Sequence, residues 1–211
     1  DLAARTTRIR IGQLANIAVW WHPLRLAEDL AVLDHMTKGR IEVGFGRGIW
    51  PYEGPQFHPH ADTRKDKDNR ELFRETIEII RKAWTQEFFS HQGVNYTFPA
   101  PDTVFSHPKF PSDPTWQDGD YVLKLSVTPK PYQKPHPPLW MTVSTDRSVT
   151  TAAELGLKAC YWQPPPLRLR ERFQLYAEIR SKREGRPFKM GEDQAVMRHT
   201  YVAPTMEEAR R

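Results

Sequence analysis

The chain has 211 residues, and 31 Lys and Arg against 26 Asp and Glu give it a formal net charge of +5. This length is enough for one sizeable hydrophobic core. The positive charges alternate with acids, as in residues 62–71, which excludes the continuous basic stripe of a nucleic-acid-binding protein. No apolar run approaches the roughly 18 residues that a membrane helix needs. Neither nucleic acid nor membrane is therefore expected as a partner.

Cys160 is the only cysteine, which excludes a disulfide framework and a cysteine-based zinc site. A reducing compartment, and hence the cytoplasm, is expected. The first residues resemble the tail of a helix, and no basic and then apolar leader precedes them. Thr205 and Glu208 fit the capping box of a helix that is just beginning. We therefore expect a piece of a longer protein, cut at both ends.

The stretch 9–48 predicts a βαβ unit. An apolar, β-branched run over 9–19 is followed by a helical pattern over 23–37, in which leucines recur at spacings of four and three. A second apolar run covers 41–45. Two strands joined by a helix are normally parallel with a right-handed crossover. Gly46-Arg47-Gly48 then lies at the carboxyl end of the second strand, where α/β proteins bind their ligands.

The centre of the first strand, Gly12-Gln13-Leu14-Ala15-Asn16, is rich in poor strand formers. Such a patch indicates either a close approach to a ligand or a plain β-bulge. The sequence leaves both interpretations open.

Gly46-Arg47-Gly48 does not fit a dinucleotide fingerprint, because the third glycine is missing and residues 49–55 cannot begin a helix. Glycine lets the backbone approach an anion and arginine binds phosphate bidentately, so an anion site is one interpretation. An ordinary ion pair of Arg47 is the other. Residues 49–61 are predicted as a loop, in which His58-Pro59-His60 lacks a third metal ligand, so no metal is expected.

A helix is predicted over 68–86, with Phe73, Ile77, Ile80 and Trp84 facing the core. Arg70 falls in its first turn, where a cation opposes the helix dipole. Arg70 therefore either points away or has an anionic partner, and a phosphate is one such partner.

Residues 88–137 are proline-rich and predict an insertion with strand-like pieces at 94–98 and 121–127. Beyond it, strands predicted at 139–143, 158–162 and 194–202 alternate with helices that end near 155, cover 167–184 and begin at Pro204 and Thr205.

Hydroxyl side chains follow the strand at 139–143. Ser144, Thr145 and Ser148 stand at the start of a helix, where hydroxyls cap the free N–H groups. The same groups can hold a phosphate. Capping alone is the more frequent use.

The predicted order alternates strands and helices throughout, which indicates a parallel sheet covered on both faces. Five strands cannot close a barrel, whereas eight can. The predicted fold class is therefore α/β, a partial (β/α)8 TIM-type barrel with about five of its eight units in one domain over 1–211. Trp20, Trp21, Trp50 and Trp162 fall at or just beyond strand ends, and aromatic walls beside a phosphate grip predict a planar phosphorylated cofactor.

Residues 22–48 and 142–157 resemble the bacterial luciferase-like monooxygenases, which are flavin-dependent (β/α)8 barrels. The resemblance rests on the combination His-Pro, Glu-Asp, Leu-Asp-x-x-Thr-x-Gly-Arg and Gly-x-Gly-Arg-Gly. It is strong over 8–84 and 131–157 and weak in the insertion. It implies an enzyme that uses reduced FMN and O₂ to oxidise a small organic substrate, with a flavin reductase as partner and a homodimer as the expected assembly.

The resemblance also implies roles for single residues. Leu14-Ala15 corresponds to a non-proline cis peptide beneath the flavin ring, Asn16 adjoins it, and Trp50 occupies a position near the flavin. The implied FMN phosphate ligands are Arg47, Arg70, Ser144, Thr145 and Ser148. The family's catalytic residues belong to barrel units that would precede Asp1, so no catalytic residue is named.

Other functions fit the same pattern. One is a deazaflavin-dependent hydride-transfer oxidoreductase of the same superfamily, which uses the same phosphate grip. Another is a non-catalytic flavin-binding relative, and a more distant one is a phosphate-substrate barrel enzyme unrelated to flavins. The sequence separates the two cofactors poorly.

Overall fold

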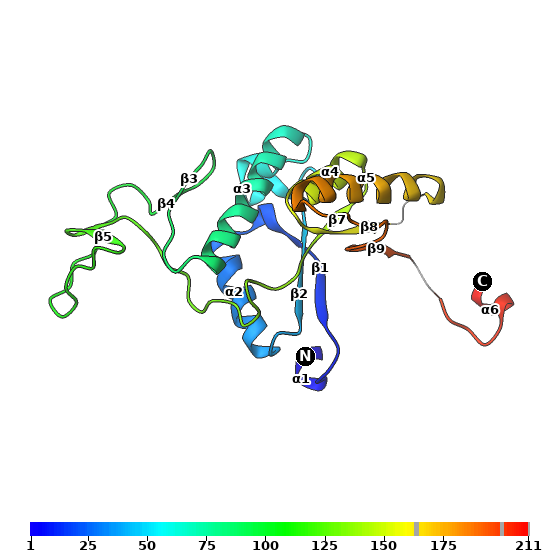
Figure 1. Ribbon diagram of the computed structural model, residues 1–211, viewed down its shortest axis with the longest axis horizontal. Coiled ribbons are helices and arrows are strands. Elements are labelled where there is room, and N and C mark those ends of the chain that lie inside the picture. The colour runs from blue at the N-terminus through cyan, green and yellow to red at the C-terminus, as the bar shows by residue number, and fades with distance from the viewer. Residues whose placement is uncertain (163–164, 199–200, 211) are drawn as a thin grey trace. The chain divides into compact units, whose positions relative to one another are not determined.

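A computed structural model describes residues 1–162, 165–198 and 201–210, which form two compact units (Figure 1). The first unit is Asp1–Leu139, and the second begins at Trp140. Each unit is built of parallel strands joined by helices, in the predicted chain order.

The first unit opens with a short helix, α1 (Leu2–Arg5), followed by strand β1 (Ile11–Ile17). Helix α2 (Pro23–Met36) joins β1 to strand β2 (Ile41–Gly46), and the two strands are parallel. The predicted βαβ unit is thus confirmed. The apolar face of α2 is buried and β2 is almost wholly buried, as expected for a strand covered on both faces.

Strand β1 is irregular at its centre. Its register against β2 shifts between Gln13 and Asn16, and the Leu14–Ala15 peptide bond is cis, as the resemblance implied. Strand β2 approaches closely here, because a Cβ on Gly44 would lie 2.4 Å from the Gln13 carbonyl oxygen. The register shift agrees with the β-bulge interpretation, and a close approach to a ligand stays a prediction. The strand also ends earlier than predicted, because residues Ala18–Trp20 form a 3₁₀ turn.

Helix α3 (Asp66–Thr85) lies beside α2 (Figure 1). It begins two residues before the predicted start, so the placement of Arg70 in the first turn was wrong and Arg70 lies in the second turn. The Trp84 indole N–H donates to the Ala27 carbonyl of α2 at 2.9 Å. The predicted core face is confirmed by the burial of Phe73, Ile77, Ile80 and Trp84.

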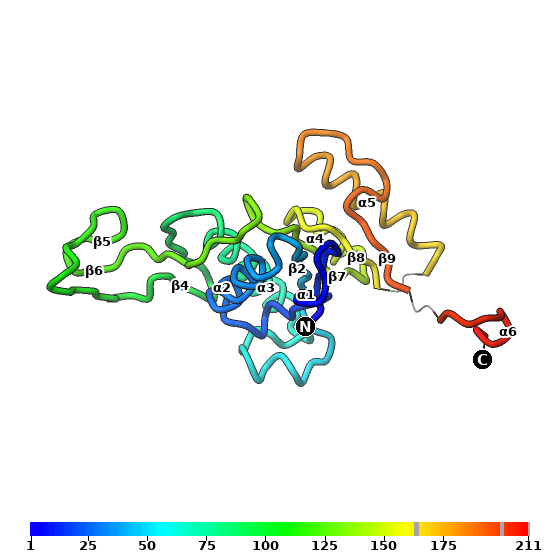
Figure 2. Tube along the Cα trace, turned by 90° about the horizontal axis from the view of Figure 1, so that it is seen from below, coloured from blue at the N-terminus to red at the C-terminus, as the bar shows by residue number. Residues whose placement is uncertain are grey.

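The insertion over 88–137 contains two short antiparallel hairpins. Strands β3 (His91–Gln92) and β4 (Thr97–Phe98) form the first, and β5 (Gln117–Asp118) and β6 (Tyr121–Val122) form the second. Both views show the part of the insertion that carries β5 and β6 projecting away from α2 and α3 (Figures 1 and 2).

The predicted strand-like pieces of the insertion were wrong in extent. Residues 93–96 form the turn of the first hairpin, so only the end of the piece at 94–98 is a strand. Strand β6 ends at Val122, although the pattern extended to 127. Apolar alternation in the sequence does not by itself distinguish a strand from a turn.

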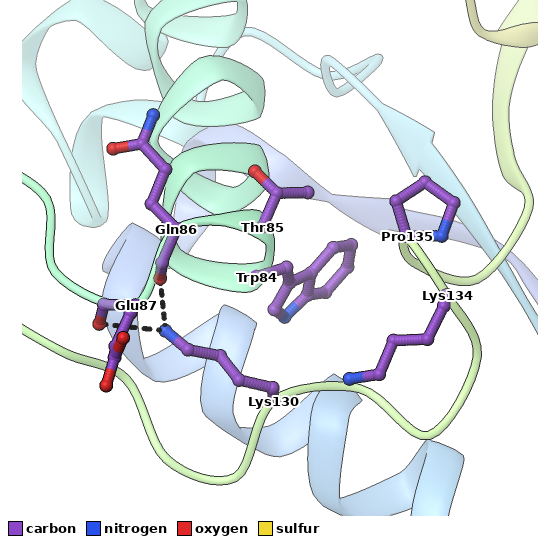
Figure 3. A pocket seen from close by; sticks show the side chains of 7 residues that line it. All are labelled: Trp84, Thr85, Gln86, Glu87, Lys130, Lys134 and Pro135. Atoms are coloured by element: carbon purple, nitrogen blue, oxygen red, sulfur yellow. Dashed lines mark hydrogen bonds between the residues drawn. The ribbon is translucent and has the colours of Figure 1, made fainter.

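A cavity of ≈ 290 Å³ lies at the end of α3 (Figure 3). Its lining combines the helix end with the segment that returns from the insertion: Trp84, Thr85, Gln86, Glu87, Lys130, Lys134 and Pro135. The Lys130 ammonium donates to the carbonyls of Ala83 at 2.8 Å and Gln86 at 2.6 Å. It thereby satisfies carbonyls that the helix end leaves unpaired, so this amine has a structural role.

The second unit contains strand β7 (Leu139–Val143) from Trp140 onward, and the parallel strands β8 (Lys158–Trp162) and β9 (Gln194–Met197). Helices α4 (Asp146–Glu154) and α5 (Pro166–Glu184) join them and pack against each other. The boundaries of β7 and β8 are as predicted.

The end of the second unit differs from the prediction. Strand β9 ends at Met197, whereas a strand to Val202 was predicted; positions 199–200 of that range lie outside the described residues. Helix α6 (Met206–Arg210) follows Thr205, whose hydroxyl oxygen accepts the Glu208 N–H at 3.2 Å, as half of the predicted capping box. Over the described ranges, none of the helices is both long and apolar enough to cross a membrane.

We predict that Gly44→Ala lowers the free energy of unfolding of the intact protein by about 3 kcal/mol, because the added methyl group forces β2 away from Gln13 and Leu14. Urea denaturation measures the change. Gly119→Ala is the control, since its Cβ meets nothing within 4 Å and only its positive φ of 57° is unfavourable, at about 1 kcal/mol. Equal losses in the two variants would contradict the close approach.

Candidate functional site

Arg47 and Arg70 converge on the carboxylate of Asp66. Both terminal nitrogens of Arg47 donate to Asp66 Oδ1 at 3.1 Å. Arg70 Nη2 donates to Oδ1 at 2.9 Å and to Oδ2 at 2.8 Å. The ion pair of Arg47 and the anionic partner of Arg70, each left as one interpretation by the sequence, are therefore confirmed.

Asn69 fixes the position of Arg47 from within the core, where its side chain is fully buried. Its Oδ1 accepts from Arg47 Nη1 at 3.0 Å, and its Nδ2 donates to the carbonyls of Arg47 at 3.2 Å and Ala61 at 3.0 Å. One amide thus holds the guanidinium, the backbone that carries it and the end of the following loop. Sequence reasoning missed Asn69; the only signal was its place between Asp66 and Arg70 on one helix.

The two guanidiniums suit an oxyanion ligand. Planar N–H donors that converge on two oxygens match carboxylate and phosphate alike. The side chains of Arg47 and Arg70 are 21% and 16% exposed, and that of Asp66 is 39% exposed, so the carboxylate is the most exposed of the three. The chemistry of these donors suits an oxyanion, and the binding of a flavin phosphate here stays a prediction.

The loop between Arg47 and α3 is closely packed on itself. A Cβ on Gly54 would lie 2.0 Å from the Ala61 carbonyl oxygen, so the two ends of the loop's tip nearly touch. Phe57 stacks on Trp20 at 5.2 Å between ring centroids. Trp50 is 57% exposed, which leaves its ring available to a ligand.

His58 and His60 join this loop to the first hairpin. His58 Nδ1 accepts the His60 N–H at 3.1 Å, and His60 Nδ1 lies 2.6 Å from Asn95 Oδ1. Burial, and next the charge of His60, lower the pKa of His58, so its neutral form persists and caps the short turn. Within the described ranges, no group of three His, Cys, Asp or Glu is placed to hold a metal.

Glu75 of α3 anchors the hairpin, and its side chain is 9% exposed. Its carboxylate accepts the N–H groups of Asn95 and Tyr96 at 2.9 Å and His91 Nε2 at 3.1 Å. Burial by itself would raise the pKa of Glu75, but the hydrogen bonds from Asn95, Tyr96 and His91 outweigh it and keep this pKa below its ordinary value. This role of Glu75 was not predicted from the sequence.

The predicted flavin-facing residues of β1 are held against β2. Asn16 Nδ2 donates to the Gly44 carbonyl at 3.1 Å, and Gln13 Nε2 donates to Asn16 Oδ1 at 3.3 Å. These contacts stabilise the irregular backbone around Leu14 and Ala15. Contact of these residues with a ligand stays a prediction.

In the second unit, Ser144, Thr145 and Ser148 form the start of α4. Ser148 Oγ accepts the N–H groups of Ser144 and Thr145 at 3.0 Å, and Thr145 Oγ1 accepts the Ser148 N–H at 3.2 Å. This arrangement is a capping box. The capping interpretation is confirmed, and the second use, phosphate binding, stays a prediction.

Together, the parallel strands and the helices that alternate with them define an α/β protein. Residues 2–211 match the sequence profile of the luciferase-like monooxygenases. The chain therefore belongs to the luciferase-like monooxygenase family.

A curated relative is the oxygenase component of the flavin-dependent trigonelline monooxygenase of Acinetobacter baylyi. It is 28% identical over an alignment of 211 positions, which covers 99% of this chain and 50% of the relative. The chain thus spans about half the length of this relative.

Two solved structures share the fold. One is the oxygenating constituent of 3,6-diketocamphane monooxygenase of Pseudomonas putida in complex with FMN, at 22% identity and a TM-score of 0.74, covering 98% of this chain and 52% of that one. The other is an F420-dependent secondary alcohol dehydrogenase, at 16% identity and a TM-score of 0.67, covering 98% and 54%. The likeness confirms the predicted fold class, a partial (β/α)8 barrel.

We predict that Glu75→Gln lowers the free energy of unfolding at pH 7 by about 2–3 kcal/mol, because an amide nitrogen cannot accept the hairpin N–H groups. Since folding lowers the pKa of Glu75 below 4.5, its contribution is present above pH 4.5 and is lost as the pH falls through the folded-state pKa. The variant should therefore show a weaker loss of stability in acid.

Urea titrations at pH 7 and pH 3 measure both effects. Glu71→Gln is the matched control, because the Glu71 side chain is 48% exposed and its partner Lys67 lies 3.9 Å away. If the free energy of unfolding of Glu75→Gln fell between pH 7 and pH 3 as much as that of the wild type, the proposed role of the Glu75 hydrogen bonds would be contradicted.

Proposed function

We propose that the intact protein is a flavin-dependent monooxygenase that uses reduced FMN and O₂ to oxidise a small organic substrate. Membership in the luciferase-like monooxygenase family supports this proposal, as does the relative named as an oxygenase component. The observation that carries it is the convergence of Arg47 and Arg70 on one oxyanion, because a flavin nucleotide brings such a group.

In this proposal each unit supplies its own ligands. In the first unit, the guanidiniums of Arg47 and Arg70 bind phosphate, and residues 14–16 and Trp50 contact the flavin. In the second unit, the hydroxyl groups of Ser144, Thr145 and Ser148 at the start of α4 bind phosphate oxygens. FMN supplies the oxygen-activating chemistry when bound; the chain holds and orients it and excludes water.

The proposed partners are a small-molecule substrate and a flavin reductase that delivers reduced FMN. The name of the Acinetobacter baylyi relative, an oxygenase component, supports a separate reductase. A homodimer and a cytoplasmic location stay predictions.

A deazaflavin-dependent oxidoreductase is the second candidate. The fold shared with the F420-dependent dehydrogenase favours it, and an arginine pair suits the phosphate of either cofactor. Parallel titrations of the intact protein with FMN and with F420 discriminate between the two. If the protein bound F420 and did not bind FMN, the deazaflavin-dependent oxidoreductase would replace the monooxygenase as the proposed function.

We predict that Arg47→Ala weakens FMN binding by about 1.5–3 kcal/mol, the range for hydrogen bonds to a charged group, and leaves riboflavin binding unchanged because riboflavin has no phosphate. Quenching of flavin fluorescence measures both affinities. Arg64→Ala is the control, since Arg64 is a 71% exposed arginine that pairs with Asp62. Unchanged FMN affinity in Arg47→Ala would mean that Arg47 is structural.

A further inference from the structure

The Asp66 carboxylate occupies the place of an anion between two arginines. Four hydrogen bonds of 2.8–3.1 Å from Arg47 and Arg70 reach its two oxygens. It is also the most exposed of the three side chains.

A phosphate and this carboxylate compete for the same donors. Both are oxyanions of similar geometry, and guanidinium N–H groups directed at one are not available to the other. The negative charge of the Asp66 carboxylate offsets one of the two positive charges of the arginines. Asp66 therefore opposes the binding of any anion at this place, by occupying the donors and by repulsion.

The local structure lets the carboxylate withdraw without disturbing the arginine. Asp66 is the first residue of α3, and a carboxylate is favoured near a helix N-terminus even without a basic partner. The Asn69 side chain still contacts both the guanidinium and the backbone carbonyl of Arg47. Asn69 thus provides a contact to the Arg47 guanidinium that does not involve Asp66.

We propose that Asp66 is an internal competitor of the flavin phosphate and that it sets the affinity of the site for the cofactor. This inference rests on the proposed function, in which Arg47 and Arg70 bind that phosphate. Asp66 takes back the guanidinium donors when the phosphate leaves, so it makes the flavin an exchangeable ligand. Such exchange suits an oxygenase that receives its flavin from another protein.

The test is the binding of FMN and riboflavin to the intact wild-type protein and to Asp66→Asn. We expect FMN to bind on the order of tenfold more tightly to the variant, through a slower dissociation rate, and riboflavin affinity to stay unchanged. Asp66→Ser, which removes the charge with another residue that suits a helix start, should do the same.

Asp68→Asn is the matched control, because it removes an equal charge from the same turn of α3, where Asp68 also belongs to the first-turn acids. Equal tightening in Asp66→Asn and Asp68→Asn would indicate a general charge effect and overturn the inference. Weaker FMN binding in Asp66→Asn and Asp66→Ser would show that Asp66 organises the arginines, and would also overturn it.

The same titrations separate this inference from the proposed function. If all variants bound FMN no better than riboflavin, the phosphate site itself would be wrong, and the inference would fail with it. If the wild type preferred FMN and Asp66→Asn did not change that preference, the phosphate site would stand and only the role of Asp66 would be overturned.

Discussion

The attachment of Arg47 to the start of α3 is the interaction on which the candidate site depends. Arg47 follows a buried strand, and its side chain and backbone are both held by Asn69. The same amide holds the end of the intervening loop at Ala61. Because Asn69 is fully buried, loss of these bonds would leave polar groups unpaired in the core. The guanidinium is therefore placed by the fold rather than by the ligand, which lowers the cost of ordering it on binding.

A second buried polar group connects this site to the insertion. Glu75 holds the turn of the first hairpin, and the Asn95 side chain in that turn contacts His60 in the loop that follows Arg47. A buried carboxylate is costly unless its oxygens are satisfied, and here several N–H groups satisfy them. The loop, the hairpin and α3 are thus one hydrogen-bonded assembly within the first unit.

The carboxylate of Asp66 affects how strongly Arg47 and Arg70 can bind a phosphate. Two guanidiniums with no anion nearby would bind phosphate strongly and release it slowly. The carboxylate of Asp66 reduces that tendency at the place where the phosphate is proposed to bind. If the proposed flavin phosphate binds at this place, the carboxylate lowers its affinity and so favours exchange of the cofactor.

The sequence by itself determined the order of strands and helices and the family, because apolar periodicity and the motif around Arg47 are local properties of the chain. It also identified Arg47 and Arg70, but it left open whether Arg47 forms an anion site or an ordinary ion pair, and whether Arg70 points away or has an anionic partner. Only the tertiary structure showed that both meet Asp66 and that Asn69 and Glu75 hold the surrounding backbone. The physical reason is that hydrogen bonds between distant segments depend on how helices and loops pack, and no local pattern of residue types records that packing.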